Sequence, residues 1–153
     1  MGKRRMAREM AVQMLYQSEM GASGAPQVMA SFDRADYLAG APGDYSERRG
    51  TVDEAFDYAR ALLVGTLEHR EEIDELIRSQ ADNWRLERMP AVDRNILRLA
   101  VYEILYEQET PDLVVVDEAI ELAKKFGSEQ SGRFINGLLD GLLRGARLKS
   151  REA

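Results

Sequence analysis

Apolar residues recur every three or four positions along most of the chain, the spacing that places side chains on one face of a helix. In the first such segment, residues 5–20, the stripe consists of Ala7, Met10, Ala11, Met14 and Leu15. Gly21 follows this stripe, so we expect the helix to end there. The next thirty or so residues are rich in glycine and proline and predict a loop-rich connection. Within this connection the sequence could form one short helix with Val28, Phe32 and Leu38 facing inward.

Two helices are predicted after this connection. Thr51 suits the N-cap of the first, whose stripe is Val52, Ala55, Phe56, Ala59, Leu62, Leu63 and Leu67. The second carries Ile73, Leu76, Ile77 and Trp84 on its apolar side. The two stripes indicate helices that pack against a core rather than helices exposed on all sides.

Pro90 suits the first turn of the next helix. The apolar residues of that helix cover more than one face and predict a central, mostly buried helix: Val92, Ile96, Leu97, Leu99, Ala100, Val101, Ile104 and Leu105. A turn at Thr110–Asp112 precedes a helix with Val116, Ala119, Ile120, Ala123 and Phe126 inward, which Gly127 should end. Ser128 can cap the last helix, whose stripe is Ile135, Leu138, Leu139 and Leu142.

The fold class follows from these elements. The run "LVVV" at residues 113–116 could form a strand, but no second segment of strand character is present to pair with it. We therefore predict an all-α protein of about seven helices, packed as a helix bundle. Gly137, Gly141 and Gly145 recur every four residues on the last helix, so we expect another helix to approach it closely.

Composition narrows the class of protein. The 153 residues are 44% hydrophobic and 31% charged, the balance of a soluble globular domain. No apolar run is long enough to cross a membrane, and the basic N-terminal segment lacks the apolar stretch of a secretory signal. Cysteine is absent, which excludes disulfides and thiolate chemistry. We expect a cytoplasmic protein that does not interact with membranes.

The residues that catalysis needs are scarce. The one histidine, His69, lies in the charged stretch "LEHREEIDE" and is expected on a solvated helix surface. Neither standard glycine-rich phosphate loop is present. We therefore expect no catalytic residues, no metal ligands and no cofactor.

Charge is distributed unevenly along the chain, whose net charge is −6. Basic residues gather near both ends, at Lys3, Arg4, Arg5 and Arg8 and at Arg144, Arg147, Lys149 and Arg151. No basic residue lies between Arg98 and Lys124, where seven acidic residues do. This distribution suits two partners of opposite charge, although a solvated acidic face would look the same.

Three aromatic residues stand beside polar neighbours. Helical geometry turns Tyr16 away from the apolar stripe of its helix and toward Arg5, and it places Phe134 at the edge of the last stripe near Arg133. Phe126 ends the preceding helix. Aromatic rings beside cations stack on the bases of single-stranded nucleic acid. Packing of both phenylalanines at the core edge, and of Tyr16 on a neighbouring loop, is the alternative.

Three long segments carry a resemblance to a known family: "RRMAREMAVQMLYQSEM", "ERMPAVDRNILRLAVYEILY" and "DEAIELAKKFGSEQSGRFINGLLDGLL". In sequence and order they resemble the NusB family of transcription antitermination factors. The resemblance implies one domain, residues 1–153, built from two three-helix bundles at about residues 3–82 and 85–148.

The resemblance also implies a function without catalysis. Family members bind the boxA element of RNA as a heterodimer with NusE, a protein of the small ribosomal subunit. The pair joins the antitermination complex on RNA polymerase, notably in ribosomal RNA operons. By position, the RNA contacts would be Lys3, Arg4, Arg5, Arg8, Gln13, Tyr16, Phe126, Arg133, Phe134 and Asn136. The NusE contacts would be Glu87, Asp93 and Glu103.

Two departures and two alternatives accompany this resemblance. The family often has an acid where this chain has Gln130, and Asp117 adds a negative charge to the acidic stretch. The fold also occurs as the N-terminal domain of RNA cytosine methyltransferases, which would need a further nucleotide-binding domain. We do not expect that domain, because the sequence ends at Ala153. A helical adaptor that binds only proteins is the other alternative.

Overall fold

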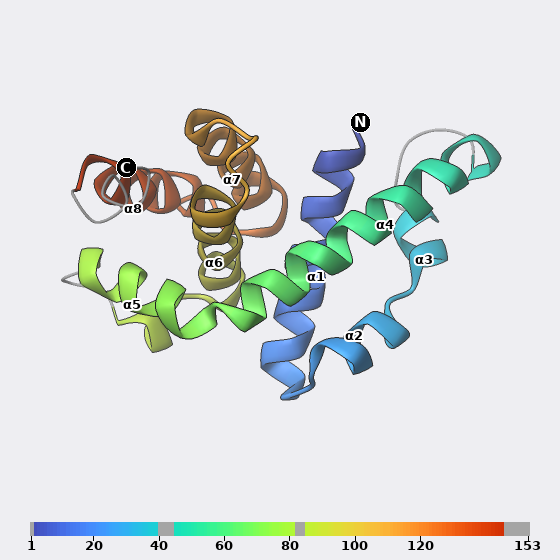
Figure 1. Ribbon diagram of the computed structural model, residues 1–153, viewed down its shortest axis with the longest axis horizontal. Helices are drawn as coiled ribbons and strands as arrows, with labels where there is room; N and C mark the ends of the chain where they lie inside the picture. The colour runs from blue at the N-terminus through green and yellow to red at the C-terminus, as the bar shows by residue number, and fades with distance from the viewer. Residues whose placement is uncertain (1, 40–44, 82–84, 146–153) are drawn as a thin grey trace. The chain divides into compact units, whose positions relative to one another are not determined.

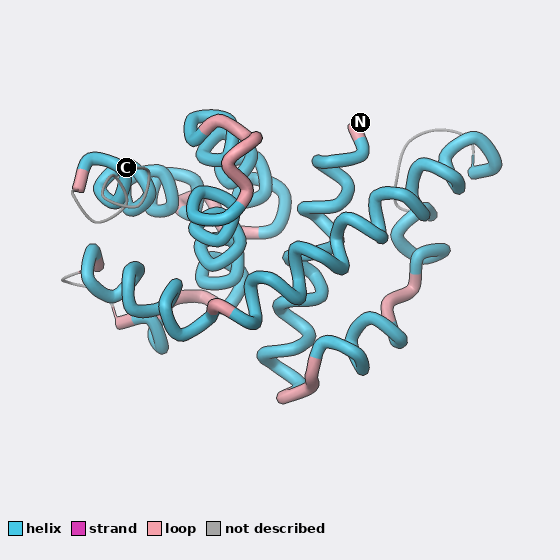
Figure 2. Tube along the Cα trace, in the orientation of Figure 1, coloured by secondary structure: helices cyan, strands magenta, loops and turns pink. Residues whose placement is uncertain are grey.

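The computed structural model describes residues 2–39, 45–81 and 85–145, with the side chains of all these residues except 38–39 and 45–49. These ranges contain eight α-helices, one 3-10 helix and no strand (Figures 1 and 2). The all-α prediction is therefore confirmed, and the number of helices is close to the seven expected.

The chain forms two compact units, Met1–Val64 and Gly65–Ala153. The division lies within helix α4 (Tyr45–Glu68) and earlier than the boundary at residues 82–85 that the resemblance implies. The helix between these two boundaries, α5 (Arg70–Gln80), belongs to the second unit. The two three-helix bundles and their bounds therefore stay a prediction.

The first unit is built on α1, Lys3–Gly21. All five residues of its predicted stripe are at most 1% exposed. The helix extends one residue further than expected, because Gly21 is its last residue and Ala22 adopts the left-handed conformation (φ 50°) that ends it. In this conformation the N–H groups of Ala22 and Ser23 reach the last carbonyls of the helix, those of Glu19 and Ser18.

Where one short helix was expected there are two, α2 (Ala25–Ser31) and α3 (Arg34–Ala39). Val28 is buried and the half-buried Phe32 stacks on Phe56, with ring centroids 5.5 Å apart, so both face inward as predicted. The prediction for Leu38 lies outside the described side chains. Arg34 lies 4.5 Å from the centroid of the same Phe56 ring, which fixes the start of α3 against α4.

The long helix α4, Tyr45–Glu68, begins six residues before the expected N-cap. Thr51 lies inside the helix, so the capping prediction was wrong. The helix start was missed because the apolar stripe begins only at Val52. The residues before it are polar and show no apolar periodicity. The stripe itself is confirmed, with Val52 to Leu63 buried at the predicted positions and Leu67 half-buried.

The second unit contains α5 (Arg70–Gln80), the 3-10 helix η1 (Leu86–Arg88), α6 (Ala91–Tyr106), α7 (Asp112–Phe126) and α8 (Ser131–Arg144). α6 packs against α5, α7 and α8 and is the central helix that its wide apolar surface predicted. Pro90 precedes α6 as its N-cap residue instead of lying in its first turn. Trp84 lies outside the described residues.

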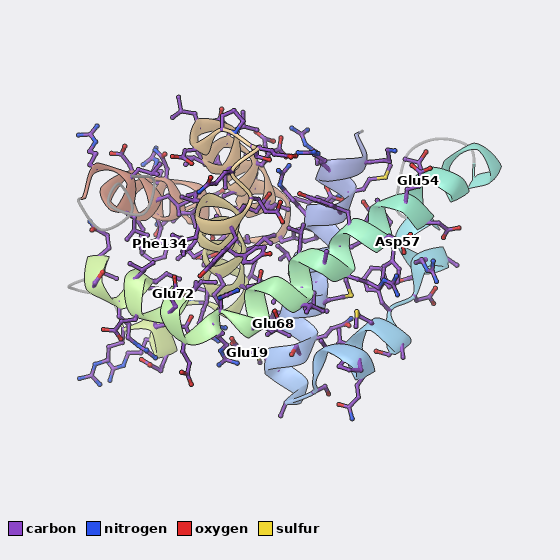
Figure 3. All side chains as sticks on the ribbon, viewed as in Figure 1. Glu19, Glu54, Asp57, Glu68, Glu72 and Phe134 are labelled. Carbon is purple, nitrogen blue, oxygen red and sulfur yellow. The ribbon has the colours of Figure 1, made fainter. Side chains whose placement is uncertain are left out.

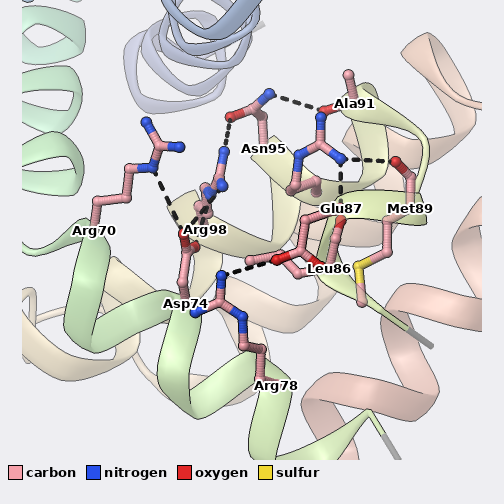
Figure 4. A network of polar contacts seen from close by, with 10 residues as sticks. Arg70, Asp74, Arg78, Leu86, Glu87, Met89, Ala91, Asn95 and Arg98 are labelled. Atoms are coloured by element: carbon pink, nitrogen blue, oxygen red, sulfur yellow. Dashed lines mark hydrogen bonds and ion pairs between the residues drawn. The ribbon is translucent and has the colours of Figure 1, made fainter. Parts of the chain in front are cut away.

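A buried ion pair joins α5 to α6 (Figure 4). Arg98 donates from Nε to Asp74 Oδ1 (2.8 Å) and from Nη2 to Oδ2 (3.1 Å), and both side chains are less than 10% exposed. Asn95 Oδ1 accepts from Arg98 Nη1, and Arg70 adds a second cation 3.6 Å from Asp74. The bidentate geometry sets the register of α5 along α6.

The segment before α6 is fixed by a second arginine. Arg94 Nη1 donates to the carbonyl oxygens of Leu86 (3.0 Å) and Met89 (2.9 Å), two acceptors of the η1 turn. Arg78 on α5 pairs with Glu87 at 3.0 Å. These contacts hold η1 between the side chains of α5 and α6.

The start of α8 differs from the prediction. The helix begins at Ser131 with Gln130 as its N-cap, and Ser128 lies three residues earlier. Ser131 Oγ instead accepts the Ser128 N–H at 2.9 Å, which closes the turn between α7 and α8. Gly127 ends α7 as expected but in extended backbone; a side chain there would lie 2.9 Å from the Ala123 carbonyl oxygen. Close packing, not a left-handed conformation, requires this glycine.

The stripe of α8 is buried as predicted, at Ile135, Leu138, Leu139 and Leu142. The close approach expected at the glycine row occurs at Gly141, where an added Cβ would overlap the side-chain amide of Gln80 on α5. A Cβ at Gly137 would meet nothing within 4 Å. None of the helices described is both long and apolar enough to cross a membrane.

Candidate nucleic-acid interface

The first candidate surface is the basic start of α1. Lys3, Arg4 and Arg5 are exposed, but Arg8 is only 4% exposed and the adjacent Glu9 only 3%. Arg8 was expected to belong to an exposed basic arm, and its burial does not fit that role. The exposed part of the arm therefore consists of three residues.

These three cations point to two sides of the helix. At about 100° per residue, Arg5 lies about 20° from Tyr16 around the helix axis, whereas Lys3 and Arg4 lie more than about 100° away from it. Lys3 forms an ion pair with Glu54 on α4. Arg4 lies over the ring of Tyr58, also on α4, 5.7 Å from its centroid. Only Arg5 shares the side of Tyr16.

Tyr16 lies off the apolar stripe, as helical geometry predicted, and is 39% exposed. Gln13, one turn earlier, is half-buried. Met20, one turn later, is 60% exposed. The side of α1 that carries Arg5 and Tyr16 thus offers a cation, an amide and a phenol ring to solvent.

The second candidate surface is an open pocket of about 530 Å³ where α7 turns into α8. It is lined by Ile120, Lys124, Gly127, Ser128, Glu129, Gly132, Arg133 and Asn136. Two predicted residues, Arg133 and Asn136, therefore meet here, together with Lys124, which the sequence analysis missed. Lys124 lies one turn before the glycine that ends α7, and this position could have indicated that Lys124 belongs to the site. Two cations at a helix start favour an anion such as phosphate, and Glu129 opposes it.

Neither of the two predicted phenylalanines lines this pocket. Phe126 is half-buried, with Lys125 Nζ 5.6 Å from its ring centroid. Phe134, labelled in Figure 3, is also half-buried and belongs to the first turn of α8. Half-burial agrees with packing at the core edge, but it also leaves part of each ring exposed. Both alternatives, core-edge packing and stacking on a base, therefore stay open for these two residues. Gln130 and Asp117, the departures from the family pattern, are exposed.

The three acids assigned to a protein partner do not form one exposed surface. Glu87 is exposed, and a backbone hydrogen bond together with the Arg78 hydrogen bond lowers the pKa of its carboxyl. Asp93 is 4% exposed and Glu103 is 2% exposed. Within the described residues, Asp93 Oδ1 is buried and accepts no hydrogen bond. Only Glu87 is available to a partner without rearrangement.

Fold and surface together describe an all-helical protein with exposed basic and aromatic side chains on α1 and a cationic pocket at the start of α8. Comparison with known proteins identifies the family. The model of the NusB family matches residues 5–144, and the chain belongs to this family.

Curated relatives match over nearly their whole length. The transcription antitermination protein NusB of Sorangium cellulosum is 47% identical over 140 residues, which is 92% of this chain and 91% of the relative. NusB of Myxococcus xanthus is 43% identical, over 92% of this chain and 94% of its own length.

Solved structures of NusB proteins are similar to this chain in fold. T. maritima NusB has a TM-score of 0.76 and 34% identity over 99% of this chain and 96% of its own. A chain from a crystal structure of the antitermination factors NusB and NusE in complex with dsRNA has a TM-score of 0.73 and 25% identity. That match covers 93% of this chain and 96% of the other.

Proposed function

We propose that this chain is an RNA-binding transcription antitermination factor of the cytoplasm. It binds single-stranded boxA RNA together with NusE, and the complex helps RNA polymerase to resist termination, notably in ribosomal RNA operons. The observation that carries the proposal is the match, over 93% of this chain, to a structure of NusB and NusE with RNA. The family comprises regulatory factors and not enzymes, and no cofactor is required.

The RNA contacts are those that the family resemblance assigns, and exposure supports most of them. Lys3, Arg4, Arg5 and Tyr16 are exposed, and Gln13 is half-buried beside them. In the second unit, Arg133 and Asn136 offer donors in the pocket. Phe126 and Phe134 are half-buried and would contribute the exposed part of each ring. Arg8 is 4% exposed and would contact RNA only if its side chain moved outward.

The NusE contact is assigned first to Glu87. Its carboxylate is exposed, and a backbone hydrogen bond followed by the Arg78 hydrogen bond lowers its pKa, which favours the charged form. Asp93 contributes if a donor from NusE reaches its buried Oδ1, which accepts no hydrogen bond from the described residues. Glu103 is 2% exposed and acts through the packing of α6.

A stand-alone domain related to the N-terminal domain of RNA cytosine methyltransferases is the second candidate. The relatives argue against it, because those named above are antitermination proteins of which this chain covers 91% and 94%. No feature of the residues that the structure describes favours the methyltransferase alternative.

The experiment is an RNA titration by fluorescence anisotropy, with and without purified NusE. A boxA-like single strand, a scrambled strand and the duplex of the boxA-like strand are compared, because one related structure holds dsRNA. We expect weak binding alone, tighter binding with NusE, and preference for the boxA-like single strand. Log affinity should fall with log salt with a slope of about −0.7 per phosphate contact. Equal affinity for all three RNAs in the presence of NusE would overturn the proposal.

A further inference from the structure

We propose that Tyr58 on α4 is a second base-stacking residue, so that bound RNA continues from the basic start of α1 onto α4. This inference rests on the RNA-binding function proposed above. It adds a contact that neither the sequence pattern nor the residues assigned from the family includes.

The geometry at the start of α1 carries the inference. Glu54 and Tyr58 lie one turn apart on α4, and each meets one basic residue of α1. Lys3 pairs with Glu54, and Arg4 lies 5.7 Å from the centroid of the Tyr58 ring. Figure 3 shows Glu54 on the part of α4 beside the start of α1. Two of the three exposed cations are thus directed at this face of α4 and not at Tyr16.

The group that covers the Tyr58 ring can be displaced. Arg4 is exposed and Tyr58 is half-buried, so this face of the ring is covered by a solvated side chain and not by the core. A cation–π contact at an exposed site is weaker than the stacking of a base on the same ring. When RNA binds, Arg4 can turn to a phosphate while a base takes its place over Tyr58.

The two tyrosines would hold separate nucleotides. Arg4 and Tyr16 are twelve residues apart, which is a rise of about 18 Å along α1. They also lie about 120° apart around the helix axis. No single base can reach both rings, so a strand that uses both must cross the start of α1.

The acids around Tyr58 limit the role to stacking. Glu54 is exposed and would repel phosphate, and Asp57 is exposed but paired with Arg60. A base is neutral, so its ring can approach Tyr58 without this repulsion. Lys3 must leave Glu54 to contact a phosphate, and this exchange contributes little because both side chains are more than half exposed.

Crosslinking on the unmodified protein tests the inference directly. A boxA-like single strand with thiouridine is bound in the presence of NusE, irradiated, and digested with trypsin. Tyr58 is the only tyrosine of the peptide Gly50–Arg60, and Tyr16 is the only tyrosine of Glu9–Arg34. We expect crosslinks in both peptides. A crosslink in Glu9–Arg34 alone would overturn the Tyr58 inference and leave the proposed function intact; no crosslink in either would count against both.

Substitutions give the size of the effect. Tyr58→Leu should weaken RNA binding roughly 5- to 150-fold with an unchanged salt slope, and Tyr58→Phe should keep most of the affinity. Tyr106→Leu is the matched control, because Tyr106 is a tyrosine on α6 that is 39% exposed and is not assigned to RNA. Wild-type affinity of a folded Tyr58→Leu protein would overturn the inference. If Tyr58→Leu does not fold, the crosslink decides.

Discussion

Arg98 holds Asp74 with two hydrogen bonds, 2.8 and 3.1 Å long, between two helices of the second unit. Removal of one partner leaves the other charge buried at less than 10% exposure. We expect Asp74→Ala to lower the free energy of unfolding by about 3–5 kcal/mol, measured by urea denaturation.

The double variant Asp74→Leu/Arg98→Met is the control for this prediction. It removes both charges, so no unpaired charge remains in the core, and it should recover much of the lost stability. A double variant no more stable than Asp74→Ala would show that packing, and not the unpaired charge, caused the loss.

Two glycines of α8 allow the effect of helix propensity on stability to be measured separately from the effect of packing. Gly137 has open space around a Cβ, so Gly137→Ala should raise the free energy of unfolding by about 0.5–1 kcal/mol. Gly141→Ala gains the same propensity, but its methyl group would overlap the amide of Gln80. We expect a smaller gain or a loss there, by chemical denaturation. Equal gains at both sites would show that Gln80 moves aside at no cost.

The glycine row on α8 also shows what the sequence could predict. The four-residue spacing indicated a close approach, but it could not show which glycine meets a neighbour, because that depends on the position of α5. The apolar stripes were predictable for the same reason that they are buried: spacing of three and four places them on one side of a helix. Helix starts were predicted less well, and both Thr51 and Ser128 failed as caps, since capping depends on local backbone geometry.

Buried charges were the other failure. Arg8, Glu9, Asp93 and Glu103 are all at most 4% exposed, although charged residues are expected at the surface. Their burial depends on neighbours from other elements, which one sequence does not reveal. In the candidate site, exposure at Lys3, Arg4, Arg5 and Tyr16 agreed with the predictions.

Asp93 allows a test of the partner surface. A carboxylate at the rim would mainly alter the association rate, but Asp93 is 4% exposed. We therefore expect Asp93→Asn to weaken NusE binding mainly through faster dissociation, measured by surface plasmon resonance. Glu87→Gln, at an exposed site, should mainly slow association in low salt. Wild-type kinetics for both variants would remove these acids from the interface.

Ionisation of Tyr102 should make the free energy of unfolding depend on pH. Burial, followed by the charges of Glu107 and Glu68, raises the pKa of its phenol above the ordinary value of 10.0. The unfolded chain then loses this proton first, so the contribution of Tyr102 to stability is fully present below pH 10 and is lost as the pH rises further. Tyr102→Phe should make stability fall less steeply above pH 10 in urea denaturation series. An unchanged slope would show that Tyr102 ionises equally in both states.

Tyr16 is where structural and functional roles are easiest to separate. The residue is 39% exposed and shares its side of α1 with Arg5. A tyrosine that stacks on a base should lose about 1–3 kcal/mol of RNA binding on truncation to alanine, with a salt slope close to wild type. Stability should change by only about 1 kcal/mol, because the ring is far from fully buried. Tyr16→Phe should retain most of the affinity, since stacking needs the ring and not the hydroxyl. Met20→Ala, at a 60% exposed position on the same helix, should leave RNA binding unchanged. Anisotropy titrations and thermal melts of the same preparations decide: if Tyr16→Ala loses several kcal/mol of stability along with its affinity, Tyr16 supports the fold instead of holding a base.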